Sequence, residues 1–393
     1  MLECGVSLRP IIAPAAQPVT DMACTWYAEG QTFFAAMRAA IAAARTRVRL
    51  ETYIYEAAGV GGHILAELVA AARRGVQVNV LVDAFGSSAL PGSFWDDLRA
   101  AGGVVRVFNP VRFNRFGIRN HRKLLVCDAA VALVGGFNIA TNYEGDGVTR
   151  GWRDVAVQLI GPLVVALGTT FDRLFTQAPF EHKRWLRFRR LGEKLALNTC
   201  GCQLLLGGPG RGSSPLERAL WLDLQHAVQA QLMVAYFLPS RRLRLALTRT
   251  ARRGGVVELM LPGKSDIALS KLAAESFYRR LLGAGIRIVE YQPQILHAKL
   301  FIIGNAVYIG SSNLDPRSLK LNYELMVRLE DPAVAAVARG LFATCRTYCR
   351  EVTPAEWRQA RSLWTRLKQR FARFVLARLD PWISLAQWRS LSD

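Results

Sequence analysis

Apolar residues in the first part of the chain follow two different spacings, one directly after the other. The first set recurs at the three-to-four-residue spacing of an amphipathic helix and comprises Ile64, Leu65, Leu68, Val69 and Ala72. Gly75 then ends that helix, and the next set alternates as in a strand and comprises Val76, Val78, Val80 and Val82. This order of helix and strand predicts an α/β sheet covered by helices on both faces.

The same order of parts occurs twice. Ala72–Gly75 and the apolar run after it recur as Ala251–Gly254 and its own apolar run, about 180 residues later. A strand ending in Thr52–Tyr55 has a counterpart ending in Ala235–Leu238. A period this long is a duplication and not a solenoid repeat. The chain therefore predicts two pseudo-symmetric α/β lobes, each a mixed β-sheet flanked by helices.

Changes in composition suggest the domain boundaries. We expect an N-terminal extension over residues 1–24, a first lobe over 25–180, a linker over 181–214, a second lobe over 215–350 and a C-terminal tail over 351–393. The expected linker contains the basic run Lys183–Arg190 and the glycine-rich run Gly207–Ser214, which is typical of a flexible connection.

The charge and composition of the chain limit the kinds of partner that it can bind. The chain has 393 residues and a formal net charge of +21, so an anionic partner is expected, either nucleic acid or an acidic membrane surface. No apolar run approaches the roughly 18–20 residues of a spanning helix, and the start of the chain lacks the pattern of a signal peptide. The seven cysteines match no zinc pattern and predict neither a structural metal nor a disulfide framework. We expect a protein of the cytosol or of a membrane surface.

The tail combines apolar residues at helical spacing with many arginines. The apolar positions are Trp357, Leu363, Trp364, Leu367, Phe371, Phe374 and Val375. This pattern is typical of a basic amphipathic helix that lies on anionic lipid. A helix packed on its own domain with a solvated basic face would give the same pattern, so both interpretations stay open.

One polar motif occurs in both halves. His121-x-Lys123-x4-Asp128 precedes Gly135-Gly136-Phe137-Asn138, and His297-x-Lys299 precedes Gly310-Ser311-Ser312-Asn313. Two distant copies predict one active site built from two halves. The residue types suit a phosphodiester, because lysines neutralise phosphate oxygens while two histidines serve as nucleophile and acid.

Strand geometry assigns sides to these residues. Alternate side chains share a face, so His121 and Lys123 point the same way, as do His297 and Lys299, whereas Asp128 has the opposite parity. The other predicted site residues have three roles. Asp154 and Glu324 orient the imidazoles, Asn138 and Asn313 donate to phosphate oxygens, and Gly136 and Ser311 let the backbone approach the phosphate. The remaining histidines, His63, His182 and His226, have no matching context.

These motifs resemble the phospholipase D superfamily, and most closely the bacterial cardiolipin synthases. The similar segments are Asn120–Val126, Val134–Ala140 and Trp152–Asp154 in the first half, with Leu261–Asp266, Leu296–Lys299 and Ile309–Ser318 in the second. The resemblance extends from about Thr25 to Asp331 and is to the shorter synthase type, without membrane helices at the amino terminus.

The resemblance implies a phosphatidyltransferase that needs no metal or cofactor. Its acceptor is phosphatidylglycerol, and its donor is phosphatidylglycerol or phosphatidylethanolamine. It makes His121 the nucleophile, which forms a phosphohistidine, and His297 the acid and base, although the symmetry of the two motifs leaves this order open. It also implies a peripheral protein on the cytoplasmic face of the bacterial inner membrane.

One position departs from the family pattern. Gly304 stands where the second motif carries Asp, and the distance from His297 to Gly310 is one residue shorter than that from His121 to Gly135. Because the missing carboxylate has the off-site parity, we expect an altered turn and a working half-site.

Two alternatives remain beside the transferase. The first is a phosphodiesterase of the same superfamily, either a lipid hydrolase or a nuclease, which the net charge of +21 also suits. The second is a non-catalytic membrane-binding scaffold, for which Gly304 is the motivation.

Overall fold

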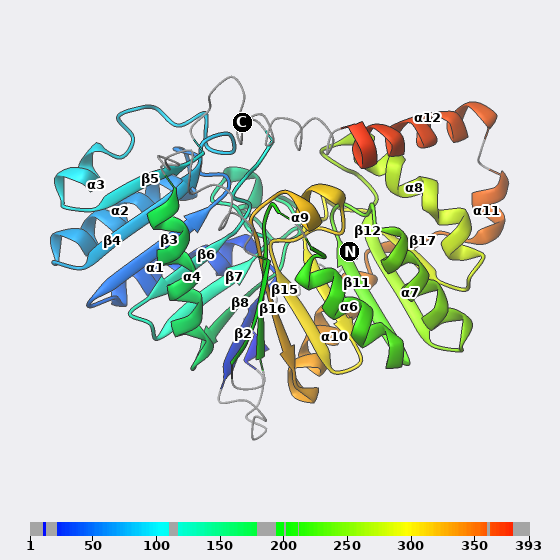
Figure 1. Cartoon of the computed structure of the whole chain (residues 1–393). Coiled ribbons are helices and arrows are strands. Elements are labelled where there is room, and N and C mark those ends of the chain that lie inside the picture. Colours follow the sequence, from blue (N-terminus) through cyan, green and yellow to red (C-terminus); the bar gives the residue numbers. More distant parts are fainter. Residues whose placement is uncertain are drawn as a thin grey trace, which may run out of the picture.

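A computed structural model describes residues 11–12, 22–109, 117–178, 194–199, 202–210, 212–359 and 362–379. His182 and the basic run Lys183–Arg190 lie outside these residues, as does most of the expected N-terminal extension. The described chain forms two lobes side by side, the first coloured blue to green in Figure 1 and the second green to red.

The first lobe contains an eight-stranded sheet in the spatial order β1-β2-β8-β7-β6-β3-β4-β5. In chain order its strands are β1 (Ile11–Ile12), β2 (Ala23–Tyr27), β3 (Arg47–Thr52), β4 (Gln77–Asp83), β5 (Val104–Phe108), β6 (Leu124–Cys127), β7 (Val131–Gly135) and β8 (Ala156–Ile160).

The second lobe contains a nine-stranded sheet in the order β17-β13-β12-β11-β14-β15-β16-β10-β9. In chain order its strands are β9 (Leu195–Thr199), β10 (Cys202–Gly207), β11 (Gln229–Val234), β12 (Val256–Pro262), β13 (Arg287–Tyr291), β14 (Lys299–Ile303), β15 (Ala306–Gly310), β16 (Glu324–Glu330) and β17 (Cys349–Glu351).

The two sheets share one topology. In the first, β3, β4 and β5 are parallel, and an antiparallel set of β6, β7 and β8 adjoins β3. In the second, β11 to β13 and β14 to β16 repeat these pairings. The prediction of two pseudo-symmetric mixed α/β lobes is confirmed.

Helices cover the outer face of each sheet. In the first lobe they are α1 (Gly30–Ala43), α2 (Val60–Arg73) and α3 (Asp96–Ala100). In the second they are α6 (Pro215–His226), α7 (Arg241–Arg252) and α8 (Ala268–Leu282). Strand alternation divides β4 between two cores: Val78, Val80 and Val82 face α1 and α2, whereas Leu81 faces the other lobe. The predicted helix end at Gly75 has a φ of 86°, a left-handed conformation that favours glycine.

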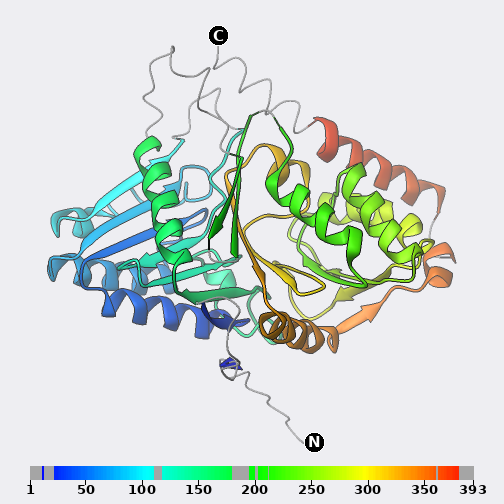
Figure 2. The same cartoon turned by 60° about the horizontal axis from the view of Figure 1, so that its bottom comes forward.

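A third core lies between the sheets. It joins Val134 of β7 and Val157 of β8 to Ile309 of β15 and Val327 of β16 in one buried cluster. α4 (Leu163–Gln177) and α10 (Pro332–Arg346) complete it from either side (Figure 2). Because both lobes bury apolar surface in this cluster, their relative placement is set by packing and not by a linker alone.

The stretch expected to be a linker differs in part from that expectation. β9 and β10 lie within it, and β10 pairs along its full length with β16. Leu204 and Leu206 of β10 are buried in the core between the lobes. The neighbouring glycines and basic residues hid this short apolar strand in the sequence. The domain boundaries predicted from the sequence otherwise stay predictions.

The described residues of the tail include two helices and a π-helical turn: α11 (Pro354–Gln359), α12 (Leu363–Phe374) and η3 (Val375–Leu379). α12 lies along α8 at the edge of the second lobe (Figure 1). Two shorter elements near the site are η1 (Thr141–Tyr143) and α9 (Pro316–Lys320). Within the described part of the chain, every helix is too short or too polar to traverse a bilayer.

Candidate active site

A cavity of about 480 Å³ lies where the two lobes meet. His121 and Asn138 line it from the first lobe, and His297 and Asn313 line it from the second. The duplicated motifs therefore face one shared space, as the sequence analysis expected of one active site. The roles of the individual residues remain predictions.

The segment before β6 holds His121 in place through the side chains on either side of it. Asn120 donates to Glu51 at 2.7 Å, and Arg122 forms a buried ion pair with the same carboxylate at 3.2 Å. These two side chains lie on the face of the sheet that α4 covers, where Arg122 also donates to the hydroxyl of Thr170 at 2.9 Å. Strand alternation then directs His121 and Lys123 to the opposite face.

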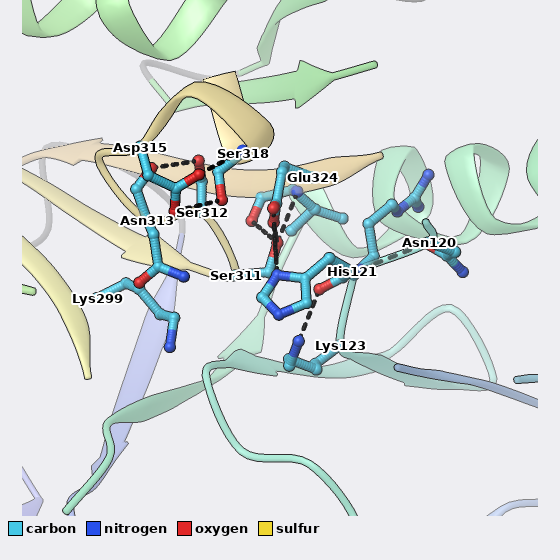
Figure 3. A network of polar contacts seen from close by, with 12 residues as sticks. Asn120, His121, Lys123, Lys299, Ser311, Ser312, Asn313, Asp315, Ser318 and Glu324 are labelled. Atoms are coloured by element: carbon cyan, nitrogen blue, oxygen red, sulfur yellow. Dashed lines mark hydrogen bonds and ion pairs between the residues drawn. The ribbon is translucent and has the colours of Figure 1, made fainter. Parts of the chain in front are cut away.

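His121 is paired with an acid of the other lobe. Its Nδ1 lies 3.1 Å from each carboxylate oxygen of Glu324, at the start of β16. The backbones of the two lobes are also hydrogen-bonded here, since the His121 N–H donates to the carbonyl of Tyr323 at 2.9 Å. Figure 3 shows the imidazole between Glu324 on one side and Lys123 on the other.

His297 has the reciprocal arrangement. Its Nδ1 lies 2.7 Å from Oδ2 of Asp154, and its N–H donates to the carbonyl of Arg153 at 2.7 Å. Each lobe thus supplies the carboxylate for the imidazole of the other. In both cases Nδ1 meets the carboxylate, so Nε2 is the ring nitrogen left for chemistry.

The two lysines are buried within this cluster. Lys123 Nζ donates to the carbonyl of His121 at 2.8 Å, and Lys299 Nζ lies 2.9 and 3.0 Å from the two ring nitrogens of His297. Burial, reinforced by the charge of Lys299, lowers the pKa of Lys123 to about 7. Burial likewise lowers the pKa of Lys299 to about 8, although Asp154 opposes the shift.

Burial shifts both imidazoles toward their neutral form. Burial lowers the pKa of His121 although Glu324 opposes it. Burial and the charge of Lys299 together lower the pKa of His297 to about 4. A neutral imidazole is the form that can attack phosphorus, and an incoming phosphate anion raises the pKa of the groups around it.

The residues predicted to bind substrate divide into two pairs. Asn138 and Asn313 line the cavity, where the Asn138 amide donates to the Tyr143 hydroxyl at 2.7 Å. Gly136 and Ser311 lie instead against the orienting acids. A Cβ at Gly136 would come within 2.1 Å of an Asp154 oxygen, and the Ser311 hydroxyl donates to Glu324. Their observed contacts are thus with the carboxylates that hold the histidines.

Asp128 lies away from the cavity. Its carboxylate accepts hydrogen bonds from the backbone N–H groups of Arg45, Thr46 and Arg47 at 2.7 to 2.8 Å. Burial tends to raise the pKa of Asp128, but these hydrogen bonds outweigh it and lower the pKa to about 2. Gly304 takes the same place in the second lobe, with a φ of 56° beside 53° at Asp128. Only Gly304 and Asn305 separate β14 from β15, which accounts for the spacing shorter by one residue.

Four aromatic residues around the imidazoles were missed by the sequence analysis. The ring of Tyr53 lies 5.0 Å from that of His121, whereas Tyr143, Trp152 and Tyr236 surround His297 at 5.3 to 6.3 Å. Tyr53 and Tyr236 occupy matching positions in the two repeated strand ends, so the duplication contained a signal for them. Tyr143 and Trp152 have no such signal in the repeat.

Further charged groups border the cavity. Arg119 and Arg317 line it from opposite lobes, and burial raises the pKa of the lining Asp315 to about 6. Among the residues that the structure describes, no group of three His, Cys, Asp or Glu side chains could hold a metal ion.

Comparisons with known proteins agree with this geometry. Residues 37–146 and 222–346 match the family described as cardiolipin synthase, PLD-like domain. The major cardiolipin synthase of Bacillus subtilis (strain 168) is 31% identical over 354 residues, which cover 88% of this chain and 73% of the relative. Cardiolipin synthase B of Escherichia coli (strain K12) is 32% identical over 327 residues and 79% of each chain. The crystal structure of phosphatidylserine synthase from Haemophilus influenzae Rd KW20 aligns with a TM-score of 0.71, at 16% identity, over 92% of this chain and 95% of that one.

Proposed function

The chain belongs to the cardiolipin synthase family of phospholipase D-like transferases, and from this premise we propose that it transfers a phosphatidyl group to phosphatidylglycerol through a phosphohistidine. The family and the enzyme class predicted from the motifs are confirmed. One observation carries the proposal: two imidazoles face a single cavity, each held at Nδ1 by a carboxylate of the opposite lobe.

The first step forms the covalent intermediate. Nε2 of His121 attacks the phosphorus of the donor lipid, so a P–N bond forms and the P–O bond to the headgroup alcohol breaks. His297, which takes up a proton at Nε2 as the lipid phosphate raises its pKa, gives this proton to the departing oxygen. Glu324 accepts a hydrogen bond from the Nδ1–H of His121 and stabilises the positive charge that develops on the ring.

In the second step His297 acts as the base and His121 is the leaving group. The headgroup hydroxyl of a second phosphatidylglycerol gives its proton to His297 and attacks phosphorus, and the P–N bond breaks to restore His121. Asn138 and Asn313, which line the cavity, donate to the phosphoryl oxygens, and Lys123 and Lys299, buried next to His121 and His297, neutralise their charge. Because charge is neutralised by these fixed groups, the phosphoryl group stays reactive until the acceptor arrives.

The cavity wall favours a lipid over a nucleic acid. Its aliphatic and aromatic members include Phe85, Leu238, Ile267 and Leu376. Phe85 and Ile267 are also about half exposed, so apolar surface continues outward from the cavity. Acyl chains would cover this surface, whereas a nucleic-acid backbone would leave it in water.

Phosphatidylglycerol vesicles test the reaction directly. Purified protein should produce cardiolipin and free glycerol in equal amounts, and quenching at alkaline pH, where the P–N bond survives, should trap a phosphatidylated histidine. Phosphatidic acid without cardiolipin would identify a hydrolase, and cleavage of DNA in place of lipid would identify a nuclease. Vesicle binding without any lipid turnover would identify a scaffold.

We further propose that α12 attaches the protein peripherally to the membrane, on the cytoplasmic face of the bacterial inner membrane. Its large apolar residues are 57 to 76% exposed and comprise Leu363, Trp364, Leu367, Phe371 and Phe374. Gln369 and Ala372, on the opposite side of the helix, are buried against the second lobe. The packed side is thus not the apolar side, which leaves a stripe free to enter the headgroup region of a bilayer.

Flotation on vesicles tests this attachment. Leu367→Ser with Phe371→Ser should reduce the fraction of protein that floats with phosphatidylglycerol vesicles. Val228→Ser with Leu222→Ser, at exposed apolar positions outside α12, is the matched control. Equal loss in both variants would contradict a specific role for the stripe. Protease treatment of spheroplasts and of inverted membrane vesicles tests the face, since digestion only in inverted vesicles is expected.

A further inference from the structure

A second cavity, of about 660 Å³, adjoins the catalytic one. The two share Leu238 and Pro316 in their walls. Four helices on the side of the second lobe contribute cations to the wall of this second cavity. The cations are Arg241 and Arg244 of α7, Arg280 of α8, Lys320 of α9, and Arg370 and Arg373 of α12. We call this space the arginine cavity.

Among the residues that the structure describes, the positive charge of the arginine cavity exceeds the negative charge that lines it. Within the described ranges, none of its six cations takes part in an ion pair. Glu217, its lining acid, accepts a hydrogen bond from Ser240. The Nε of Arg244 is buried and has no hydrogen-bond partner among the described residues. Burial and then the charges of Arg373, Arg280 and Arg241 lower the pKa of Arg244, which reflects the same crowding of like charges.

The fold holds these cations together despite their repulsion. The guanidinium groups of Arg244 and Arg373 lie over the ring of Phe277 at 4.7 and 5.6 Å. Gln369 of α12 donates to Glu275 of α8 at 3.0 Å and fixes the two helices against each other. Arg280, Arg370 and Arg373 also line a neighbouring cavity of about 520 Å³, so the positive surface continues along the seam between α8 and α12.

An anion with several oxygen atoms would relieve this repulsion. Guanidinium groups bind phosphate through paired, parallel hydrogen bonds and retain their charge at every physiological pH. The exposed apolar stripe of α12 lies on the same helix as Arg370 and Arg373, and Phe374 contributes to both the stripe and the cavity wall. An anion that enters from a membrane surface therefore meets apolar and cationic groups together, as a phospholipid requires.

We propose that the arginine cavity binds the phosphate of an anionic phospholipid, a second lipid beside the one whose phosphorus is attacked. The proposal rests on the proposed function for the nature of that first lipid. Because the cavities share a wall, lipid bound here lies next to the catalytic cavity, where a two-lipid reaction needs its second substrate. Its retention raises the local concentration of anionic lipid at the site.

Binding of the full chain to vesicles tests the proposal without any turnover. Vesicles of phosphatidylcholine with one fifth phosphatidylglycerol are titrated, and the apparent Kd is measured by co-sedimentation. Arg280→Gln with Arg373→Gln should weaken binding roughly tenfold or more, because it removes charge-assisted hydrogen bonds. Arg73→Gln with Arg249→Gln removes the same number of charges at exposed helix ends outside the cavity, and it should weaken binding by less than about threefold.

Two further arms separate the sources of the anion. Arg280→Lys with Arg373→Lys retains the charge without the planar fork and should give an intermediate Kd, which also shows that the site tolerates substitution. Soluble dihexanoyl phosphatidylglycerol should compete with the vesicles far better than inorganic phosphate. Equal competition by inorganic phosphate would assign the cavity to free phosphate and overturn the proposal, as would tighter binding of a short DNA duplex that depends on these same arginines.

Failure of this inference is distinguishable from failure of the proposed function. If the glutamine variant binds vesicles as the control does, while the wild type makes cardiolipin, the inference is wrong and the function stands. If the wild type makes no cardiolipin while the arginine variants lose vesicle binding, the site stands and the function fails.

Discussion

The two half-sites share a histidine, a lysine and an asparagine but place them in different surroundings. His121 is 12% exposed and faces both oxygens of Glu324 at 3.1 Å, whereas His297 is 5% exposed and meets one oxygen of Asp154 at 2.7 Å. Lys299 contacts the ring of its own histidine, but Lys123 contacts a backbone carbonyl. A duplicated sequence has thus produced two chemically distinct imidazoles, which is what a reaction with separate nucleophile and acid requires.

The exchange of carboxylates makes the halves interdependent. Asp154 belongs to the lobe of His121 but holds His297, and Glu324 belongs to the lobe of His297 but holds His121. A lobe on its own would present an imidazole without its orienting acid. The duplication therefore cannot be understood as two independent sites, and changes in one lobe should alter the chemistry of the histidine in the other.

The largest expected effect comes from removing either imidazole. His121→Ala and His297→Ala should each reduce transfer on the order of 10³-fold or more, because nucleophilic and acid catalysis are lost respectively. A phosphatidyl nitrophenol donor separates the two, since nitrophenolate leaves without a proton. His297→Ala should still release one nitrophenolate per enzyme in a burst, and His121→Ala should not. A burst in His121→Ala alone would reverse the two roles.

Neutralising the exchanged acids should come next. Asp154→Asn and Glu324→Gln should each slow turnover by on the order of 10²–10³-fold, because the tautomer and the developing positive charge are no longer supported. Asp154→Asn acts on His297 across the lobes, so the nitrophenolate burst should remain while turnover slows. Glu324→Gln should slow the burst itself. Rapid-quench kinetics measure the burst. A slowed burst in Asp154→Asn together with a normal burst in Glu324→Gln would contradict the pairing of each acid with the histidine of the other lobe.

Substitutions at Gly136 and Ser311, which contact the two acids, should have effects of intermediate size. Gly136→Ala places a methyl group within 2.1 Å of an Asp154 oxygen and should displace it, with a loss of activity on the order of 10²-fold. Ser311→Ala removes a hydrogen bond to Glu324 without a clash and should cost about tenfold, as expected for about 1.5 kcal/mol. Steady-state kinetics measure the two losses of activity, and thermal melting controls for a loss of stability. A larger loss of activity in Ser311→Ala than in Gly136→Ala would mean that these contacts do not determine how well the acids are placed.

A pH profile compares the lysines. Both have lowered pKa values, about 7 for Lys123 and about 8 for Lys299, so both are charged at acid pH and become neutral as the pH rises through those values. For each lysine, kcat/KM should fall up to tenfold per pH unit above its pKa in the free enzyme. Lys123→Arg should remove the limb near 7 and leave the one near 8. A flat profile up to pH 9 would contradict the need for these charges.

Strand parity and the internal repeat were the features of the sequence from which the site could be predicted. Alternation placed His121 and Lys123 on one side and Asp128 on the other, and the repeat aligned the two motifs. Parity assigns a face but names no partner, so the pairing of His121 with a carboxylate 203 residues away could not be obtained from it. Helical spacing likewise identified the apolar stripe of α12, but tertiary packing through Gln369 and Ala372 decided which side faces outward.

The smallest expected effects come from the turn in which the two motifs differ. Asp128 accepts three backbone N–H groups, so Asp128→Asn should lower the free energy of unfolding by about 1 kcal/mol, with activity unchanged within twofold, because the carboxylate is partly exposed and distant from the cavity. Gly304 has a positive φ with open space around it, so Gly304→Ala should cost about 1 kcal/mol through backbone strain alone.

The pH dependence of unfolding distinguishes Asp128→Asn from Gly304→Ala. The pKa of Asp128 is lowered in the folded state to about 2 from the ordinary 3.8, so its contribution is full above pH 3.8 and is lost as the pH falls toward 2. Urea unfolding between pH 2 and 5 should therefore show a weaker pH dependence in Asp128→Asn and an unchanged one in Gly304→Ala. A large loss of activity in Asp128→Asn would instead place this carboxylate in the chemistry, and the absence of its counterpart at Gly304 would then have to impair the second half-site.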